Sequence, residues 1–238
     1  MTPAPSDLPT RIAAARRRVE AAAGVVGRHP DEIDLLLAVK TQSVDAVRAA
    51  IGAGATLLGH NRAQELVAVE PALADLPHST HFIGRLQSNK VTKVVPLVTC
   101  VQTVDERTTA ERLDRVAGTA DRVLDVFVQV NTSGESTKSG VRPDYAVELA
   151  EIVGAQPHLH LRGFMTIGAN HPDTEVVRAS YERLALLRDE VLGSGAPGTG
   201  DARELSMGMS RDLEIAIAAG ATMVRLGTAV FGPRPLVG

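Results

Sequence analysis

Residues 33–59 read IDLLLAVKTQSVDAVRAAIGAGATLLG, and the order of elements in this segment indicates the fold class. It opens on an almost wholly apolar run, Ile33 to Val39, which predicts a strand covered on both faces. Ser43 then predicts the N-cap of a helix that ends at a glycine-rich turn. A second apolar run, Thr56 to Gly59, follows the turn. A strand, a helix and another strand in this order predict a parallel sheet covered by helices.

The same alternation continues to the end of the chain. The segment AIGAGAT at 50–56 recurs as AIAAGAT at 216–222, each time where a helix ends and a strand begins, which indicates a repeated unit. The predicted strands are Ile33 to Val39, Thr56 to Gly59, His81 to Ile83, Leu97 to Gln102, Val123 to Val130, Leu159 to Ile167, Glu204 to Ser206 and Met223 to Leu226. Helices are predicted over 62–75, 87–95, 106–118, 143–154 and 173–192, and after an N-cap at Ser210.

Eight strand and helix units predict an α/β protein of one domain over residues 1–238, a (β/α)8 barrel of the TIM type. An amphipathic helix within residues 1–28 is expected to pack on the barrel as an extra element. A doubly wound sheet is the alternative architecture. In a barrel, ligand-binding side chains are expected at the carboxyl ends of the strands.

Composition excludes several classes of partner. Lys and Arg number 25 against 28 Asp and Glu, aromatic residues make up 3% and Trp is absent, so we expect no nucleic-acid partner. Apolar runs are far shorter than the roughly 20 residues of a membrane span, and no secretory signal is evident. Cys100 is the one cysteine and can form no intramolecular disulfide or thiolate cluster. We expect a cytoplasmic monomer without a metal site.

Lys40 is the first candidate for chemistry, because it directly follows the first predicted strand. Its ammonium is expected at the mouth of the barrel beside apolar walls. Partial removal from water lowers the pKa of a lysine, and a neutral amine attacks a carbonyl to form a Schiff base. A lysine at the end of a strand also simply points into water in many proteins.

The loops after the last two strands supply a complementary anion site. Phosphate sites in such barrels form from these loops, which here combine hydroxyl groups, glycines that allow close approach of the backbone, and a cation. The residues are Met207, Gly208, Ser210, Arg225, Gly227 and Thr228. An amine that captures carbonyls, facing a phosphate cradle, indicates pyridoxal phosphate or a phosphorylated sugar.

Several longer segments carry a resemblance to a known family. They are LLLAVKT around Lys40, GHNRAQE from Gly59, HFIGRLQSNK from His81, KSG at Lys138, LRGFMTI from Leu161 and LSMGMSRDLEIAIAAGATMVRLGTAVFG from Leu205 to Gly232. Together they resemble the YggS/PROSC family of pyridoxal phosphate homeostasis proteins, over nearly the whole chain after the first helix. The family is similar to the barrel domain of alanine racemase (fold type III) without the second domain of that enzyme.

The resemblance implies roles for individual residues. Lys40 would hold pyridoxal 5'-phosphate through a Schiff base, with Met207 and Gly208 also in the binding site. Ser210, Gly227 and Thr228 would hold the phosphate, Arg225 would lie near the pyridine nitrogen, and Asn61 would line the ring pocket. A cation opposite that nitrogen disfavours its protonation and weakens the ring as an electron sink. The resemblance therefore implies a carrier that buffers or delivers the cofactor, with PLP-dependent apo-enzymes as further partners.

Two positions depart from the family pattern. Val39 stands where relatives usually have Ser or Thr, which removes a hydroxyl near the Schiff base. His60 stands where they have Glu, which replaces an anion by a titratable ring. Neither change touches Lys40 or the phosphate loops, so cofactor binding is still expected.

Three other functions stay open on the sequence. A PLP-dependent racemase or lyase would need a second acid or base at the mouth, and the chain has just two tyrosines, Tyr145 and Tyr181, both in predicted helices. A Schiff-base aldolase or phosphosugar isomerase would use Lys40 and the same cradle without a cofactor. An interaction protein would recruit apo-enzymes through the loop after the third strand.

Overall fold

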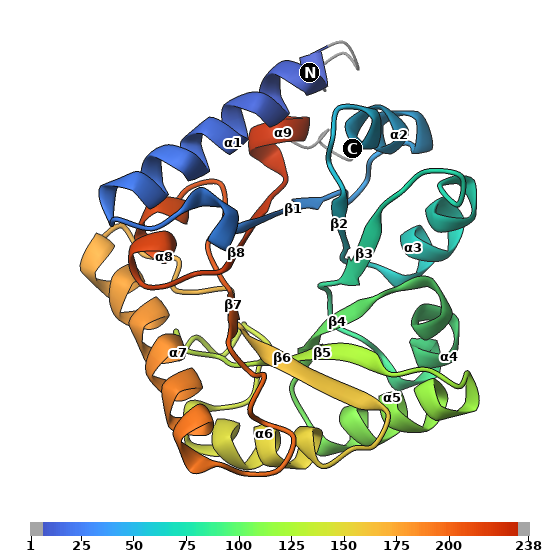
Figure 1. Cartoon of the computed structure of the whole chain (residues 1–238), viewed down its shortest axis with the longest axis vertical. Helices are drawn as coiled ribbons and strands as arrows, with labels where there is room; N and C mark the ends of the chain where they lie inside the picture. Colours follow the sequence, from blue (N-terminus) through green and yellow to red (C-terminus); the bar gives the residue numbers. More distant parts are fainter. Residues whose placement is uncertain (1–6, 233–238) are drawn as a thin grey trace.

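A computed structural model describes residues 7–232, in which eight parallel strands form a closed barrel surrounded by helices (Figure 1). The strands are β1 (Asp34–Ala38), β2 (Leu57–His60), β3 (Ser79–Phe82), β4 (Cys100–Val104), β5 (Leu124–Gln129), β6 (Leu159–Met165), β7 (Glu204–Ser206) and β8 (Met223–Leu226). The helices are α1 (Leu8–Val25), α2 (Val44–Gly52), α3 (Ala63–Val69), α4 (Val91–Val94), α5 (Arg107–Thr119), α6 (Ala146–Gly154), α7 (Thr174–Ser194), α8 (Leu213–Ala218) and α9 (Thr228–Phe231).

The barrel closes because β8 pairs in parallel with β1, which places Leu36 opposite Arg225 and Leu37 opposite Leu226. Each strand also pairs with the next strand along the chain, so the barrel has no free edge. This architecture confirms the predicted (β/α)8 barrel and makes the doubly wound alternative wrong.

Two apolar clusters fill the molecule. The smaller lies inside the barrel, where Leu36, Cys100, Phe127, Met165 and Met223 from five different strands meet. The larger lies between the barrel and the helices, and it contains the alternate residues of the same strands. Successive side chains of a strand point to opposite faces, so every strand of this barrel is buried on both sides. That burial explains the nearly continuous apolar runs in the sequence.

The N-terminal helix α1 lies across α8 and α9 on the outside of the barrel (Figure 1). Leu8, Ile12, Ala15 and Val19 form its buried stripe, at the spacing that an amphipathic helix requires. The structure confirms an extra helix on the barrel over the residues that it describes. Residues 1–6 of the predicted segment 1–28 lie outside them.

Some element boundaries differ from the prediction. The fourth strand begins at Cys100 and not at Leu97, because Val95–Leu97 form a helical turn that Pro96 opens. The predicted helix 87–95 is two turns of 3₁₀ type around the short α4, and the predicted helix 62–75 changes to a 3₁₀ turn at Glu70. Ser210 is not the N-cap of α8. Asp212 holds that position, since the chain first makes another turn.

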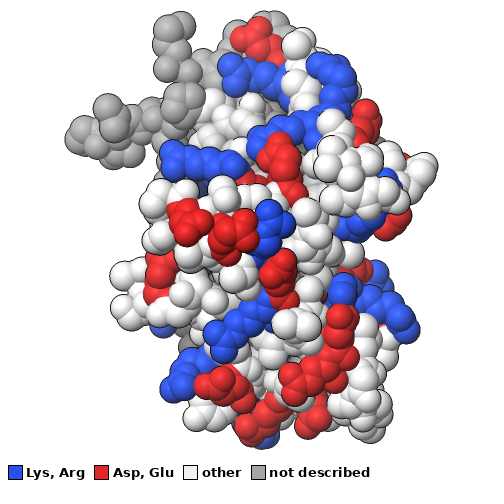
Figure 2. Space-filling view, turned by 90° about the vertical axis from the view of Figure 1, so that its left-hand side faces the viewer, with Lys and Arg blue, Asp and Glu red and all other residues white. Residues whose placement is uncertain are grey.

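The outer surface carries mixed charges. Figure 2 shows acidic and basic side chains interspersed on the face that α1 and α7 help to form, without a broad area of one sign. Within residues 7–232, no helix combines the length and the apolar character that crossing a membrane would require. Over the same part of the chain, no three His, Cys, Asp or Glu side chains lie where they could hold a metal ion together.

Candidate cofactor site

Lys40 lies just past the carboxyl end of β1 and is half-buried. Asp34, Leu36 and Ala38 belong to one face of β1, the face that Leu36 presents to the barrel interior, and Lys40 is next in this alternation. The backbone then turns sharply, with a φ of 62° at Thr41, whose hydroxyl donates to the carbonyl of Lys40 at 2.6 Å. A positive φ at a threonine is costly, so this turn is held by its surroundings.

Hydroxyl groups from the loops after β7 and β8 lie next to one another. Thr228 Oγ1 donates to Ser210 Oγ at 3.3 Å, and the backbone N–H of Ala229 reaches the same oxygen at 3.4 Å. These groups are donors of the kind that binds a phosphate oxygen. A Cβ placed on Gly227 would lie 3.3 Å from the carbonyl oxygen of Ala38, so this loop touches the end of β1 two residues before Lys40. The structure therefore brings the lysine segment and the hydroxyl groups together.

Arg18 of α1 fixes the loop that carries Ser210. Its guanidinium donates to the carbonyl of Ser210 at 2.7 Å and to both carboxylate oxygens of Glu214, at 2.5 and 2.7 Å. On the far side of the loop, Asp212 Oδ1 accepts from the backbone N–H of Met209 at 2.7 Å. The sequence gives no indication of this role for Arg18. A bidentate partner 196 residues away gives no local signal.

Arg225 projects into the barrel interior from β8 and is 7% exposed. Its guanidinium donates to Ser206 Oγ at 2.8 Å and to the carbonyl of Thr166, at the end of β6, at 2.7 Å. Burial lowers the pKa of Arg225 to about 10, and the nearby Asp212 opposes that shift. The group is still a cation at neutral pH, held by neutral acceptors.

Gly208 and Met207 play different parts in the loop after β7. Gly208 has a φ of 91°, and a Cβ there would lie 2.5 Å from the Cβ of Ala216, so the position requires glycine. Met207 is fully buried in the apolar cluster outside the barrel. Its side chain therefore packs in the core, and Met207 could contact a ligand at the mouth through its backbone alone.

Asn61 directly follows β2 at the same end of the barrel and is half-buried. The backbone of the next loop presses against it, because a Cβ on Gly84 would lie 1.9 Å from the carbonyl oxygen of Asn61. Thr103 Oγ1 donates to the carbonyl of Gly84 at 2.8 Å and holds that loop in place. The segment around His81 thus supports Asn61 through its backbone.

His60, at the end of β2, lies in a buried polar cluster. His60 Nε2 is 3.4 Å from Glu70 Oε1, and Glu70 also accepts from Thr80 Oγ1 at 2.7 Å and from His78 Nε2 at 3.1 Å. Glu70 is 8% exposed, so its carboxylate depends on these partners. His60 Nε2 thus lies within ion-pair distance of an anion supplied by another segment, while neither ring nitrogen of His60 has a hydrogen-bond partner among the described residues.

We expect Glu70→Gln to lower stability at neutral pH by about 1–3 kcal/mol, since buried partners lose a charge-assisted acceptor. Burial alone raises the pKa of Glu70, but its three polar partners together outweigh burial and hold it below the usual value. The stabilisation that the Glu70 carboxylate gives the fold is therefore complete above its pKa in the unfolded chain. It is lost as the pH falls through its lower pKa in the folded protein. Thermal unfolding measured between pH 3 and 7 should show that Glu70→Gln loses less stability on acidification (the acid loss) than the native protein does. An acid loss equal to that of the exposed control Glu190→Gln would contradict this.

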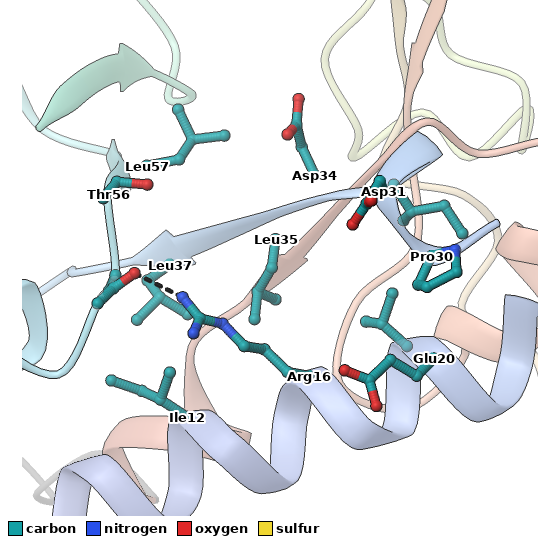
Figure 3. A pocket seen from close by; sticks show the side chains of 14 residues that line it. Ile12, Arg16, Glu20, Pro30, Asp31, Asp34, Leu35, Leu37, Thr56 and Leu57 are labelled. Atoms are coloured by element: carbon teal, nitrogen blue, oxygen red, sulfur yellow. Dashed lines mark hydrogen bonds between the residues drawn. The ribbon is translucent and has the colours of Figure 1, made fainter.

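Two cavities open at the opposite, N-terminal end of the strands. One, of about 300 Å³, lies between α1 and the start of β1, where Arg16 donates to the carbonyl of Gly54 at 2.5 Å (Figure 3). The other, of about 550 Å³, lies under the barrel and is lined by His81, Arg162 and Glu204 among others. Neither is lined by Lys40 or Arg225, so both are distinct from the site at the carboxyl end.

The residues at the carboxyl end fit a phosphorylated carbonyl cofactor. An amine just after β1, adjacent hydroxyl groups on the two last loops and a buried guanidinium on β8 are complementary partners for an aldehyde, a phosphate and a ring nitrogen. The sequence matches the family described as alanine racemase, N-terminal domain, over residues 12–235. An alanine racemase of Clostridium difficile 630 shares the fold, with a TM-score of 0.73 and 14% identity over 93% of this chain and 57% of that one. The fold is thus that of an alanine racemase N-terminal-domain barrel.

Closer relatives define the family. The chain is 41% identical over 230 residues to the pyridoxal phosphate homeostasis protein of Pseudomonas aeruginosa, covering 96% of each protein. The structure of PipY of Synechococcus elongatus PCC7942 with PLP bound has a TM-score of 0.79 and 31% identity, over 90% of this chain and 99% of that one. The chain belongs to the pyridoxal phosphate homeostasis protein family.

Proposed function

We propose that this protein binds pyridoxal 5'-phosphate covalently at Lys40 and serves its homeostasis by buffering or delivering it. The observation that carries the proposal is the contact between the end of β1 and the loop that begins at Gly227. That contact sets the lysine segment beside the hydroxyl groups of Ser210 and Thr228. The names of the relatives and the PLP bound to PipY support the same cofactor.

The cofactor, when bound, supplies an aldehyde for the amine and a ring that withdraws electrons. Ser210, Thr228 and the backbone at Gly208 and Gly227 would hold its phosphate, and Asn61 would line the ring. Arg225 would face the ring nitrogen as a cation and disfavour its protonation. A site arranged in this way retains the cofactor more readily than it stabilises carbanions.

We further propose that the protein turns over no substrate of its own. A racemase of the two-base type needs a second acid or base across the substrate. Tyr145 is 53% exposed in a turn before α6, and Tyr181 is fully buried in α7. Burial raises the pKa of the Tyr181 hydroxyl, which opposes a role as a base. The chain is proposed to act as one domain and a monomer in the cytoplasm, passing PLP to apo-enzymes.

An absorption spectrum of the purified protein, before and after borohydride, tests the proposal. A visible band that is bleached by borohydride, with the modified peptide mapping to Lys40, is the expected result. A colourless protein that also fails to take up added pyridoxal phosphate would favour an aldolase that uses Lys40 without a cofactor.

The Ser210→Ala variant is expected to release pyridoxal phosphate more readily. Loss of one hydroxyl to a phosphate oxygen costs on the order of 1.5 kcal/mol, which is roughly tenfold in Kd. Equilibrium dialysis at fixed pH measures the change. Ser194→Ala removes a hydroxyl at the end of α7, where it bonds the carbonyl of Val191, and is the matched control. Equal affinities of the two variants for pyridoxal phosphate would contradict the placement of the phosphate site at Ser210.

A further inference from the structure

A chain of hydrogen bonds crosses the barrel interior from Arg225 to His81. Arg225 Nη1 donates to Ser206 Oγ at 2.8 Å, and Ser206 Oγ donates to Gln102 Oε1 at 2.6 Å. Gln102 Nε2 then approaches His81 Nδ1 at 2.7 Å. We call these four residues the interior relay. They come from β8, β7, β4 and β3, and every donation along the relay runs in the same direction.

The relay affects the orientation of Arg225, because the buried guanidinium is held by neutral hydrogen-bond acceptors. Its guanidinium donates hydrogen bonds to Ser206 Oγ and to the carbonyl of Thr166. Within residues 7–232, no carboxylate forms a hydrogen bond or an ion pair with it. A bidentate carboxylate would fix the plane of a guanidinium by itself. Here, the orientation depends on how the neutral acceptors are held.

Gln102 determines whether the Ser206 hydroxyl directs a lone pair or its proton toward Arg225. A hydroxyl has one proton and two lone pairs, and it rotates to suit its neighbours. Because the proton of Ser206 is committed to Gln102 Oε1, its lone pairs stay available to Arg225. Gln102 and Ser206 are both fully buried, so no bulk water competes for these groups. Without the amide oxygen, the hydroxyl would be free to turn its proton toward the guanidinium.

His81 in turn determines how the Gln102 amide lies. Burial lowers the pKa of His81 to about 4, so the ring is neutral and Nδ1 accepts from the amide N–H. The same amide nitrogen lies 3.0 Å from Met223 Sδ, a second weak acceptor. An amide turned by 180° would set its oxygen against the lone pair of Nδ1. The two acceptors therefore keep the Gln102 oxygen directed toward Ser206.

We propose that Ser206, Gln102 and His81 are positioning residues that fix the guanidinium of Arg225 against the ring nitrogen of the bound cofactor. The inference rests on the proposed function, because the ring nitrogen is the group that Arg225 is proposed to face. It adds to the site three residues that line the barrel interior and would act on the cofactor through Arg225. It also links the cofactor end of the barrel to the N-terminal cavity, which His81 lines.

The test uses the protein loaded with pyridoxal phosphate and follows the visible band as a function of pH. A fixed cation beside the ring disfavours protonation of the cofactor, so loosening Arg225 should move the midpoint of this titration to higher pH. We expect a rise of about 0.5 pH unit or more, roughly threefold in the proton equilibrium, for Ser206→Ala and for Gln102→Met. His81→Phe should give a smaller rise in the same direction.

The double variant separates a relay from two independent packing effects. Residues that act through one pathway give non-additive effects, so Ser206→Ala combined with Gln102→Met should shift the midpoint no further than Ser206→Ala alone. Thr199→Val is the matched control, because Thr199 is a buried threonine whose hydroxyl bonds the carbonyl of Ala196 in the loop before β7, outside the relay and outside the proposed cofactor site. Its midpoint should equal that of the native protein.

The outcomes distinguish this inference from the proposed function. Absence of any visible band in the native protein with added pyridoxal phosphate would overturn both. A native band whose midpoint does not move in Ser206→Ala and in His81→Phe would overturn the relay alone. In the cofactor-free protein, ¹⁵N resonances of the imidazole should show His81 protonated at Nε2, and Gln102→Met should shift them. His81→Phe, whose side chain borders a cavity, keeps the test valid if Gln102→Met fails to fold.

Discussion

Lys40→Ala is expected to abolish every pyridoxal phosphate adduct that borohydride can reduce. The alanine has no amine, and the carbonyl cofactor would be held by the phosphate contacts alone. Loss of the covalent bond should remove the visible band altogether and lower retention on dialysis by at least tenfold, about 1.4 kcal/mol. Mass spectrometry after borohydride reduction measures the adduct directly.

Lys93→Ala provides the control for Lys40→Ala. Lys93 is exposed on α4 and is one of the few other lysines of the chain. Its loss should leave both the adduct and the band unchanged. A reducible adduct that persists on Lys40→Ala at native stoichiometry would refute the assignment of Lys40.

Gly84→Ala is expected to lower the free energy of unfolding by about 3 kcal/mol, at the upper end for overpacking. The added Cβ would lie 1.9 Å from the carbonyl oxygen and 2.7 Å from the Cα of Asn61. Backbone must move to relieve such a contact, since no flexible side chain is involved. The movement displaces Asn61, so pyridoxal phosphate retention should fall together with stability. Denaturant titration and equilibrium dialysis measure the two effects.

Gly193→Ala is the matched substitution for Gly84→Ala. Gly193 lies near the end of α7, and a Cβ there would have nothing within 4 Å. Alanine should stabilise the helix by roughly 0.5–1 kcal/mol and leave cofactor retention unchanged. A Gly84→Ala variant as stable as Gly193→Ala would show that the loop after β3 does not press on Asn61.

Much of the fold could be predicted because its signals are local. The apolar run before Lys40 and the glycine-rich turn that recurs at 50–56 and 216–222 predict strands and helix ends directly. Eight such units favour a closed barrel, while a doubly wound sheet would also bury both faces of each strand, so the closure itself came from the structure. The fourth strand is predicted too early because the run from Leu97 to Gln102 has the composition of a strand, while in the structure Leu97 ends a helical turn and the strand begins at Cys100. Ser210 is predicted as a helix cap because Asp212 and Glu214 follow it and Gly220 closes the segment, whereas the structure has Asp212 at the cap position.

The sequence also predicted which residues could form a cofactor site, since strand ends of a barrel meet at one mouth. It could not predict what holds those residues. Arg18 reaches Ser210 across 192 positions, and Gly84 touches Asn61 through the backbone. Met207 belongs to the same motif as Gly208, yet alternation along β7 turns its side chain into the outer core.

Hydrophobic periodicity and turn chemistry depend on neighbouring residues, so they are enough to predict alternating strands and helices, the lysine after the first strand and the two loops rich in hydroxyl groups and glycine. The tertiary structure alone decided how a buried Arg225 is oriented. Ser206, Gln102 and His81 are separated by up to 125 positions along the chain, and they act together because the barrel closes and directs their side chains into one interior free of competing water.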